Sequence, residues 1–178
     1  MRTEIVFTLT GPDRVGIVEE VTRVMLALDA NVETSRMARL GGEFAILMLA
    51  SLPEDAVTRV DGAFASLVSR GYKVTTNRTE AGDAGDAAGR LRYRIVVEGA
   101  DHEGIIHEIA AGLSARGVNI ESMETAISEA PVSGTPLFFM TAIVAVPPDL
   151  AETDWIEAVT EAGEQANVDV EVTVAERA

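Results

Sequence analysis

An internal repeat is the feature of this sequence that most restricts its fold. The run Gly-Pro-Asp-Arg-Val-Gly-Ile-Val at 11–18 returns 88 positions later as Gly-Ala-Asp-His-Glu-Gly-Ile-Ile at 99–106. The run Asn-Val-Glu-Thr at 31–34 returns at the same offset as Asn-Ile-Glu-Ser at 119–122. Two separated segments that share one offset indicate a duplicated unit. We therefore expect two similar domains rather than one.

A segment without large apolar side chains divides the 178 residues. Residues 80–89 read Glu-Ala-Gly-Asp-Ala-Gly-Asp-Ala-Ala-Gly, which is typical of a flexible linker. We predict a first domain over 1–79, a linker over 80–89 and a second domain over 90–178. Both domains fall within the usual size range of a compact unit.

Hydrophobic periodicity predicts four strands and two helices in each domain. The first domain is expected to have strands over 3–9, 32–40, 44–52 and 72–78, with helices over 15–29 and 54–70. The second is expected to have strands over 91–98, 118–128, 137–146 and 168–174, with helices over 103–116 and 151–166. The order βαββαβ predicts an α+β, ferredoxin-like fold, in which a four-stranded antiparallel sheet carries both helices on one face.

Charge and composition restrict the partners. The formal net charge is −15, of which residues 1–79 carry −1 and residues 90–178 carry −11. The single lysine, Lys73, and the lack of a basic run argue against nucleic-acid binding, which needs clustered cations. There is no cysteine, which excludes disulfides and thiolate sites. No apolar run approaches the about 20 residues of a membrane helix, and the first residues are not typical of a secretory leader, so we expect a cytoplasmic protein with no membrane contact.

The repeated motifs resemble those of ACT domains, in the residues 11–17 and 31–33 of the first half and their counterparts in the second. The duplication, together with the Ala130–Phe138 loop, more narrowly resembles the glycine cleavage system transcriptional repressor family. The resemblance implies tandem βαββαβ regulators that bind an amino acid, glycine being the implied ligand. It also implies control of a transcriptional activator by protein contact, without direct DNA binding.

The repeated loops also suit an amino-acid ligand on chemical grounds. The first turn of a helix offers unpaired backbone N–H groups to a carboxylate, and a glycine there leaves room for its approach. An asparagine amide offers both an acceptor for the ammonium and a donor for the carboxylate. The predicted ligand-binding residues are Asp13, Arg14, Val15, Gly16, Ile17 and Asn31 in the first half, and Asp101, His102, Glu103, Gly104, Ile105 and Asn119 in the second.

Each of these residues also has a purely structural interpretation. Asp13 and Asp101 are expected first of all as helix N-caps. Asn31 and Asn119 suit a left-handed turn before a strand equally well. Arg14 is either an anchor for a carboxylate or an exposed loop residue. Its replacement by His102 in the second half indicates that the two sites differ.

No catalytic set, metal site or cofactor site is predicted, so we expect a regulatory protein and not an enzyme. Open sheet edges favour a homodimer. Two alternatives stay open: a regulatory partner of a metabolic enzyme, or an acidic protein-interaction module that binds no ligand. The contact surface of that module would be the acidic side of the helix over 151–166, with the residues Glu152, Asp154, Glu157, Glu161 and Glu164.

Overall fold

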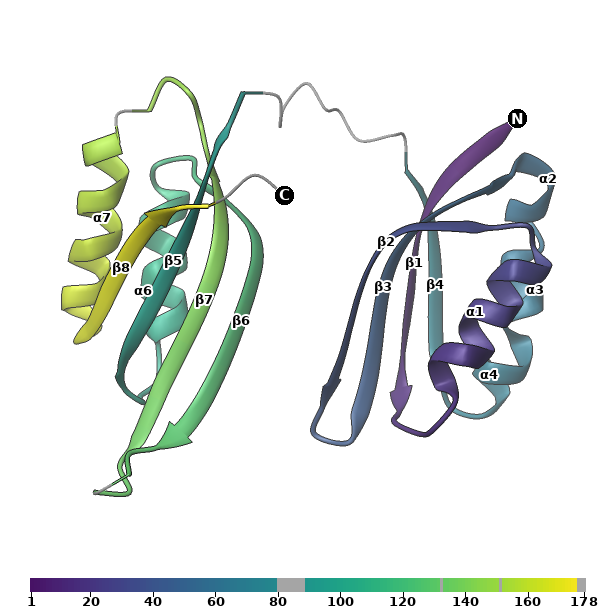
Figure 1. The fold of residues 1–178 in the computed structure, drawn as a ribbon, viewed down its shortest axis with the longest axis horizontal. Helices are drawn as coiled ribbons and strands as arrows, with labels where there is room; N and C mark the ends of the chain where they lie inside the picture. Colours follow the sequence, from purple (N-terminus) through teal and green to yellow (C-terminus); the bar gives the residue numbers. More distant parts are fainter. Residues whose placement is uncertain (80–88, 132, 151, 176–178) are drawn as a thin grey trace. The chain divides into compact units, whose positions relative to one another are not determined.

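Strand β1 (Arg2–Pro12) lies inside a four-stranded antiparallel sheet with the order β2-β3-β1-β4 (Figure 1). The apolar residues Ile5, Phe7 and Leu9 alternate along β1 and are fully buried. Because successive side chains of a strand point to opposite faces, this alternation gives the sheet one apolar face. The other three strands are β2 (Asn31–Leu40), β3 (Glu43–Pro53) and β4 (Lys73–Thr79).

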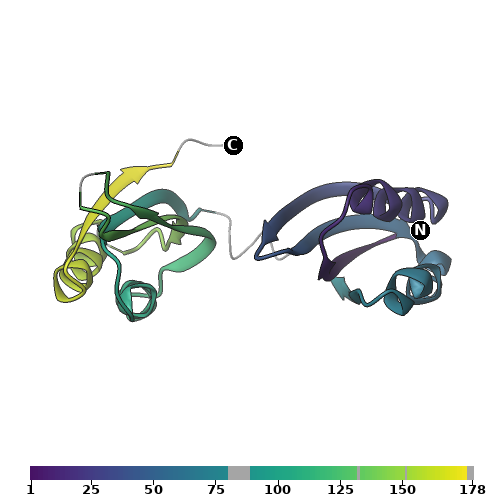
Figure 2. The same cartoon turned by 90° about the horizontal axis from the view of Figure 1, so that it is seen from below.

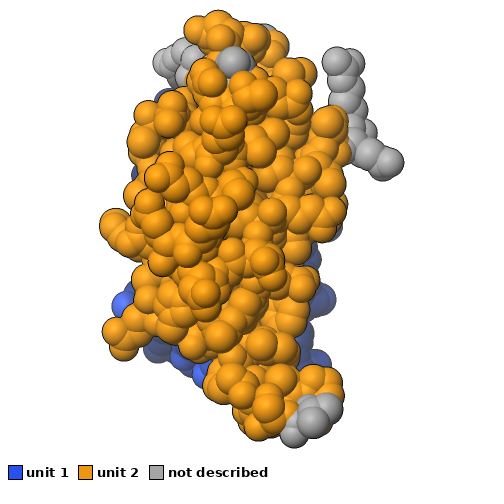
Figure 3. Space-filling model, turned by 90° about the vertical axis from the view of Figure 1, so that its left-hand side faces the viewer, with its two compact units in different colours: residues 1–83 blue, residues 84–178 orange. Residues whose placement is uncertain are grey.

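The computed structural model describes residues 1–79, 89–131, 133–150 and 152–175. The chain divides into two units, Met1–Asp83 and Ala84–Ala178, which Figure 3 colours separately. Of the predicted linker 80–89, all but Gly89 lies outside the described residues.

The second unit repeats the fold of the first, with the strand order β6-β7-β5-β8. The two sheets and the helix order confirm the predicted α+β, ferredoxin-like fold. Every strand and helix of this unit begins and ends within two residues of its predicted range. The elements are β5 (Leu91–Ala100), α6 (Ile105–Ser114), β6 (Asn119–Glu129), β7 (Pro136–Val146), α7 (Glu152–Gln165) and β8 (Val168–Val174).

In each unit the helices cover one face of the sheet, as Figure 2 shows. The first core joins β1 to α1 (Ile17–Ala27) and to the helices before β4, and its Phe7 and Phe64 rings lie 4.7 Å apart. In the second core the Tyr93 ring meets the Trp155 ring edge-on at 4.9 Å. These few aromatic side chains join each sheet to its second helical segment.

The second helix of the first unit differs from the prediction. Residues 54–70 form three short helices, α2 (Glu54–Val57), α3 (Val60–Ala63) and α4 (Ala65–Ser69). The breaks fall at Thr58–Arg59 and at Phe64, where tighter i→i−3 hydrogen bonds replace some helical ones. Thr58 and Gly62 are poor helix formers, whereas the burial of Val60 and Phe64 keeps the segment on the sheet.

A glycine on the first strand of each unit lets the start of the last strand, or the residue just before it, approach closely. A Cβ on Gly99 would lie 2.6 Å from Val168 Cγ1, and a Cβ on Gly11 would lie 2.5 Å from Tyr72 Cδ1. Real side chains do not come so close, so at this position the fold requires glycine in both units.

Gly99→Ala should therefore overpack the second core. We expect the free energy of unfolding of the second unit to fall by about 1–3 kcal/mol, measured by urea unfolding. Adding Val168→Ala removes the clashing Cγ1, so the double variant should lose less than the sum of the two single variants. Gly62→Ala is the control, because nothing lies within 4 Å of its Cβ position; a loss there as large as in G99A would contradict the explanation.

Candidate functional site

The junction between the first strand and the first helix of each unit has a left-handed glycine. Gly16 is the N-cap residue of α1 at φ 86°, and Gly104 is the N-cap residue of α6 at φ 97°. An L side chain rarely adopts these angles, so backbone conformation alone accounts for the repeated glycine. The same conformation turns the chain from the sheet into the helix, and it leaves open space at the Gly104 Cβ position.

The prediction that Asp13 and Asp101 cap these helices is wrong. The N-cap residues are Gly16 and Gly104, and among the described residues no side chain caps the first turn of α1 or α6. Asp13 instead pairs with Arg39, Nε to Oδ2 at 2.8 Å, and its N–H donates to the Gly42 carbonyl. Backbone hydrogen bonds from Asp13 and Asp101 hold each loop to the neighbouring hairpin, and the N–H of Ile17 donates to the Arg14 carbonyl at 3.4 Å.

Asn31 and its own glycine loop lie at opposite ends of the first sheet. Asn31 pairs with Ser51, whereas Pro12, which leads into the loop, pairs with Glu43, eight residues away on β3. At about 3.3 Å per residue this separation is about 26 Å. In the second unit Asn119 is separated from its loop by the same number of residues along β7. No small ligand can contact the loop and the asparagine of one unit together.

The repeated Asn-x-Glu motif coincides with a β-bulge. The pairing of β2 with β3 shifts between Val32 and Thr34, and that of β6 with β7 shifts between Ile120 and Ser122. Asn31 is extended, and the left-handed residue of that turn is Asp29, at φ 55°. The interpretation of the asparagines as left-handed turn residues is therefore wrong, and the recurrence marks a bulge that bends the edge strand.

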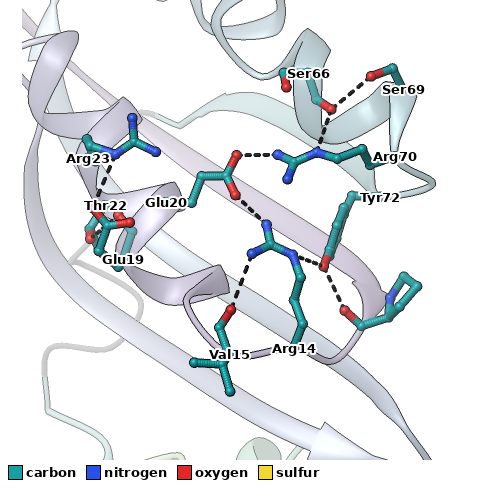
Figure 4. A network of polar contacts seen from close by, with 11 residues as sticks. Arg14, Val15, Glu19, Glu20, Thr22, Arg23, Ser66, Ser69, Arg70 and Tyr72 are labelled. Carbon is teal, nitrogen blue, oxygen red and sulfur yellow. Dashed lines mark hydrogen bonds and ion pairs between the residues drawn. The ribbon is translucent and has the colours of Figure 1, made fainter.

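Arg14 contacts a carboxylate of its own chain. Its Nη2 pairs with Glu20 on α1, and its Nε donates to the Tyr72 hydroxyl at 3.1 Å (Figure 4). The Tyr72 hydroxyl in turn donates to the Pro12 carbonyl at 2.7 Å. The second oxygen of Glu20 pairs with Arg70, at the end of α4. This network, Arg14–Glu20–Arg70–Tyr72, ties the first glycine loop to both helical segments.

Electrostatics in this network favours the charged forms. Hydrogen bonds from Arg70 and then from Arg14 lower the pKa of the Glu20 carboxyl below its ordinary value. The hydrogen bond to Glu20 raises the pKa of Arg14. Sequence reasoning missed Glu20, Arg70 and Tyr72 because Arg70 lies 50 residues from Glu20 and no local pattern joins them.

His102 takes the place of Arg14 in the second unit. Its Nε2 lies 2.6 Å from the Ala166 carbonyl oxygen and its Nδ1 lies 2.9 Å from that of Glu103. Only an imidazolium can donate from both nitrogens. These two acceptors, Glu103 first, therefore raise the pKa of His102. As in the first unit, the side chain ties the glycine loop to the segment before the last strand.

A hollow of about 770 Å³ opens beside the second loop, and we call it the apolar hollow. The predicted residues that line it are Asp101, His102, Gly104 and Ile105; Glu103 and Asn119 are not among its lining residues. The lining residues outside the predicted set are Ile106, His107, Ala110, Thr125, Ala126, Ile127 and Phe138. They come from α6, β6 and β7, and only the fold brings them together.

The remaining predicted loop residues differ in exposure. The side chain of Val15 is fully exposed, whereas Ile17 is buried in the first core and offers a ligand only its backbone. Among the residues that the structure describes, no three His, Asp or Glu side chains gather as a metal site would require. In the same part of the chain, every helix is too short or too polar to cross a bilayer.

Comparison with known proteins agrees with this architecture. The ACT domain family matches residues 3–68. A protein of unknown function from Galdieria sulphuraria is 33% identical, with a TM-score of 0.86, and the alignment covers 99% of this chain and 100% of that one. Residues 3–68 therefore form an ACT domain, and the second unit repeats its fold. A second crystal structure, provisionally assigned as a glycine cleavage system transcriptional repressor, has a TM-score of 0.70 at 21% identity, with 99% of both chains covered, and supports the fold.

A shorter match relates this tandem ACT-domain protein to a regulator. The glycine cleavage system transcriptional repressor of Escherichia coli (strain K12) is 42% identical over 57 residues, and that of Shigella flexneri gives the same values. The matched segment covers 32% of this chain and 30% of each repressor. The sequence resemblance to these repressors is therefore shown for one segment of 57 residues.

Glu20→Gln should weaken the first unit only where Glu20 is charged. Because folding lowers the pKa of Glu20, its carboxylate contributes stability above about pH 4.3, the ordinary value, and the contribution is lost as the pH falls through the lower folded value. As the pH is lowered, the free energy of unfolding should therefore fall less steeply in E20Q than in the parent protein. Urea unfolding from neutral to acid pH measures this difference. Glu19→Gln is the control, since Glu19 pairs with Arg23 in an exposed i,i+4 contact. Equal curves for E20Q and the parent would contradict the prediction.

His102 should give the second unit the opposite pH dependence. Because folding raises its pKa, the contribution is complete below about pH 6.5, the ordinary value, and is lost as the pH rises through the higher folded value. The free energy of unfolding of the second unit should therefore fall between mildly acid and mildly alkaline pH, and His102→Gln should flatten that fall. His107→Gln, which removes the only other histidine, should keep it. A fall that survives in H102Q would show that another group is responsible.

Proposed function

We propose that this chain is a non-catalytic, cytoplasmic regulatory protein that binds a small amino acid and acts on a transcriptional regulator by protein contact. The observation that carries the proposal is the duplicated helix N-terminus at Gly16 and Gly104, whose first-turn N–H groups have no side-chain cap. Such groups, with the partial positive charge of the helix end, suit a carboxylate.

Glycine is the first candidate ligand. The matched Escherichia coli relative is named a glycine cleavage system transcriptional repressor. Glycine is also small enough to approach a loop in which the N-cap residue is itself a glycine. A zwitterion has no net charge, so a chain with a net charge of −15 repels it far less than an anionic metabolite.

A homodimer would complete the site. Asn31 lies about 26 Å from its own loop, so it can contact a loop-bound ligand only at a loop other than its own, and a second chain would supply such a loop. In such a dimer the loop residues Asp13–Ile17 would bind the carboxylate, and the amide of Asn31 from the second chain would bind the ammonium. Ligand contacts that exist only in the dimer would then couple binding to assembly.

The partner would be a protein with a basic surface. The helix α7 exposes the carboxylates of Glu152, Asp154, Glu157, Glu161 and Glu164. The same surface supports a second candidate function, a docking module that binds its partner without any amino acid. A pull-down that weakens with salt but ignores amino acids would favour this second function.

A calorimetric panel of all twenty amino acids tests the first function. We expect glycine to release or absorb heat on binding to the full chain, and Asn31→Ala to weaken binding roughly tenfold or more, as the loss of a hydrogen bond to a charged group would. Asn77→Ala, at an exposed position of β4, is the matched control. No response to any amino acid would refute ligand binding, and unchanged affinity in N31A would remove that residue from the site.

A further inference from the structure

The apolar hollow beside Gly104 is much larger than glycine. Its volume of about 770 Å³ falls in the range of about 300–1,000 Å³ typical of small-molecule sites. Glycine would occupy a small part of it and leave the apolar walls in contact with water. Size alone therefore separates this hollow from a site built for the smallest amino acid.

The walls of the hollow leave apolar surface exposed. Ile106 on α6 is 43% exposed and Ile127 on β6 is 64% exposed, although both are large and hydrophobic. Phe138 on β7 is 5% exposed, and Ile105 and the small Ala110 and Ala126 complete the apolar lining. An apolar ligand group that displaces water here gains roughly fourfold in affinity for each buried methylene.

The polar groups of the hollow suit the carboxylate and the ammonium of an amino acid. Gly104 is the N-cap residue of α6, whose first turn has no side-chain cap, so the N–H groups of that turn can donate hydrogen bonds to a carboxylate. Asp101 and Thr125 are lining residues too, and a carboxylate and a hydroxyl suit an ammonium. The hollow thus combines two polar ends for a zwitterion with an apolar space for its side chain.

At the matching positions of the first unit the side chains are polar, and two of them form an ion pair. Ile127 corresponds to Arg39, which forms an ion pair with Asp13 at 2.8 Å, and Ala110 corresponds to Thr22. An ion pair therefore lies where the second unit presents an isoleucine and an aspartate to the hollow. The two units share a backbone and differ in what they can bind.

We propose, building on the proposed function, that the second unit binds an amino acid with a large apolar side chain, of the size of leucine, isoleucine or phenylalanine. Its carboxylate lies at the first turn of α6 and its side chain lies between Ile106 and Ile127. The two units are then sensors of different amino acids, and glycine is not the ligand of the second.

Calorimetry on the full chain with leucine, isoleucine, phenylalanine, glycine and glutamate tests this assignment. The large apolar amino acids should bind about tenfold or more tightly than glycine to a chain that carries Asn31→Ala, which weakens the first site. Ala110→Phe should fill the hollow and weaken leucine binding on the order of tenfold, and Thr22→Phe, at the matching position of the first unit, should not. Ile127→Ser is a second variant at an exposed position, for use if A110F unfolds; it should weaken leucine binding in the same way.

Each outcome separates this inference from the function on which it rests. If glycine binds and the large apolar amino acids do not, the inference fails and the proposed function stands. If no amino acid binds, both fail. If leucine binds with equal affinity to the parent, A110F and I127S, its site lies elsewhere and the inference is overturned. Weaker leucine binding in A110F and I127S, but not in T22F, supports the inference.

Discussion

The left-handed glycine between the first strand and the first helix is the constraint on which the rest of each unit depends. It turns the chain back over the sheet, so that α1 and α6 bury their apolar sides against β1 and β5. Because the residue at the N-cap is glycine and not a capping side chain, the same turn also leaves backbone donors uncapped. Fold and candidate site therefore arise from one conformational requirement, which explains why the motif is present in both halves.

Around that shared turn the two units use different chemistry. In the first, the Arg14–Glu20–Arg70–Tyr72 network surrounds the loop with charges that satisfy one another. In the second, His102 joins the loop to two carbonyl groups, and an apolar hollow takes the place of the ion pair between Arg39 and Asp13. A duplicated fold thus keeps its backbone while its loops diverge, and the two proposed sites differ for that reason.

Much of the fold was predictable because it depends on local patterns. Apolar patterns placed the strands, and spacing of three and four residues placed α1, α6 and α7, within two residues of their ends, except that β1 continues three residues further, to Pro12. The breaks at Thr58–Arg59 and Phe64 escaped prediction because burial of Val60 and Phe64 holds a segment that its own propensity does not keep continuous. The sequence identified both glycines of the site. It did not show that they, and not Asp13 and Asp101, are the N-cap residues, because residue type alone does not determine backbone angles.

The sequence by itself determined the duplication, the βαββαβ order and the position of the two glycine loops, because each depends on residues close together in the chain. Only the tertiary structure decided which groups meet. Sheet register placed Asn31 at the far end from its loop, and folding brought Arg70 to Glu20 across 50 residues. It also assembled the apolar hollow from a loop, a helix and two strands. Register and long-range contacts depend on how whole elements pack, so they cannot be predicted from a local pattern in the chain.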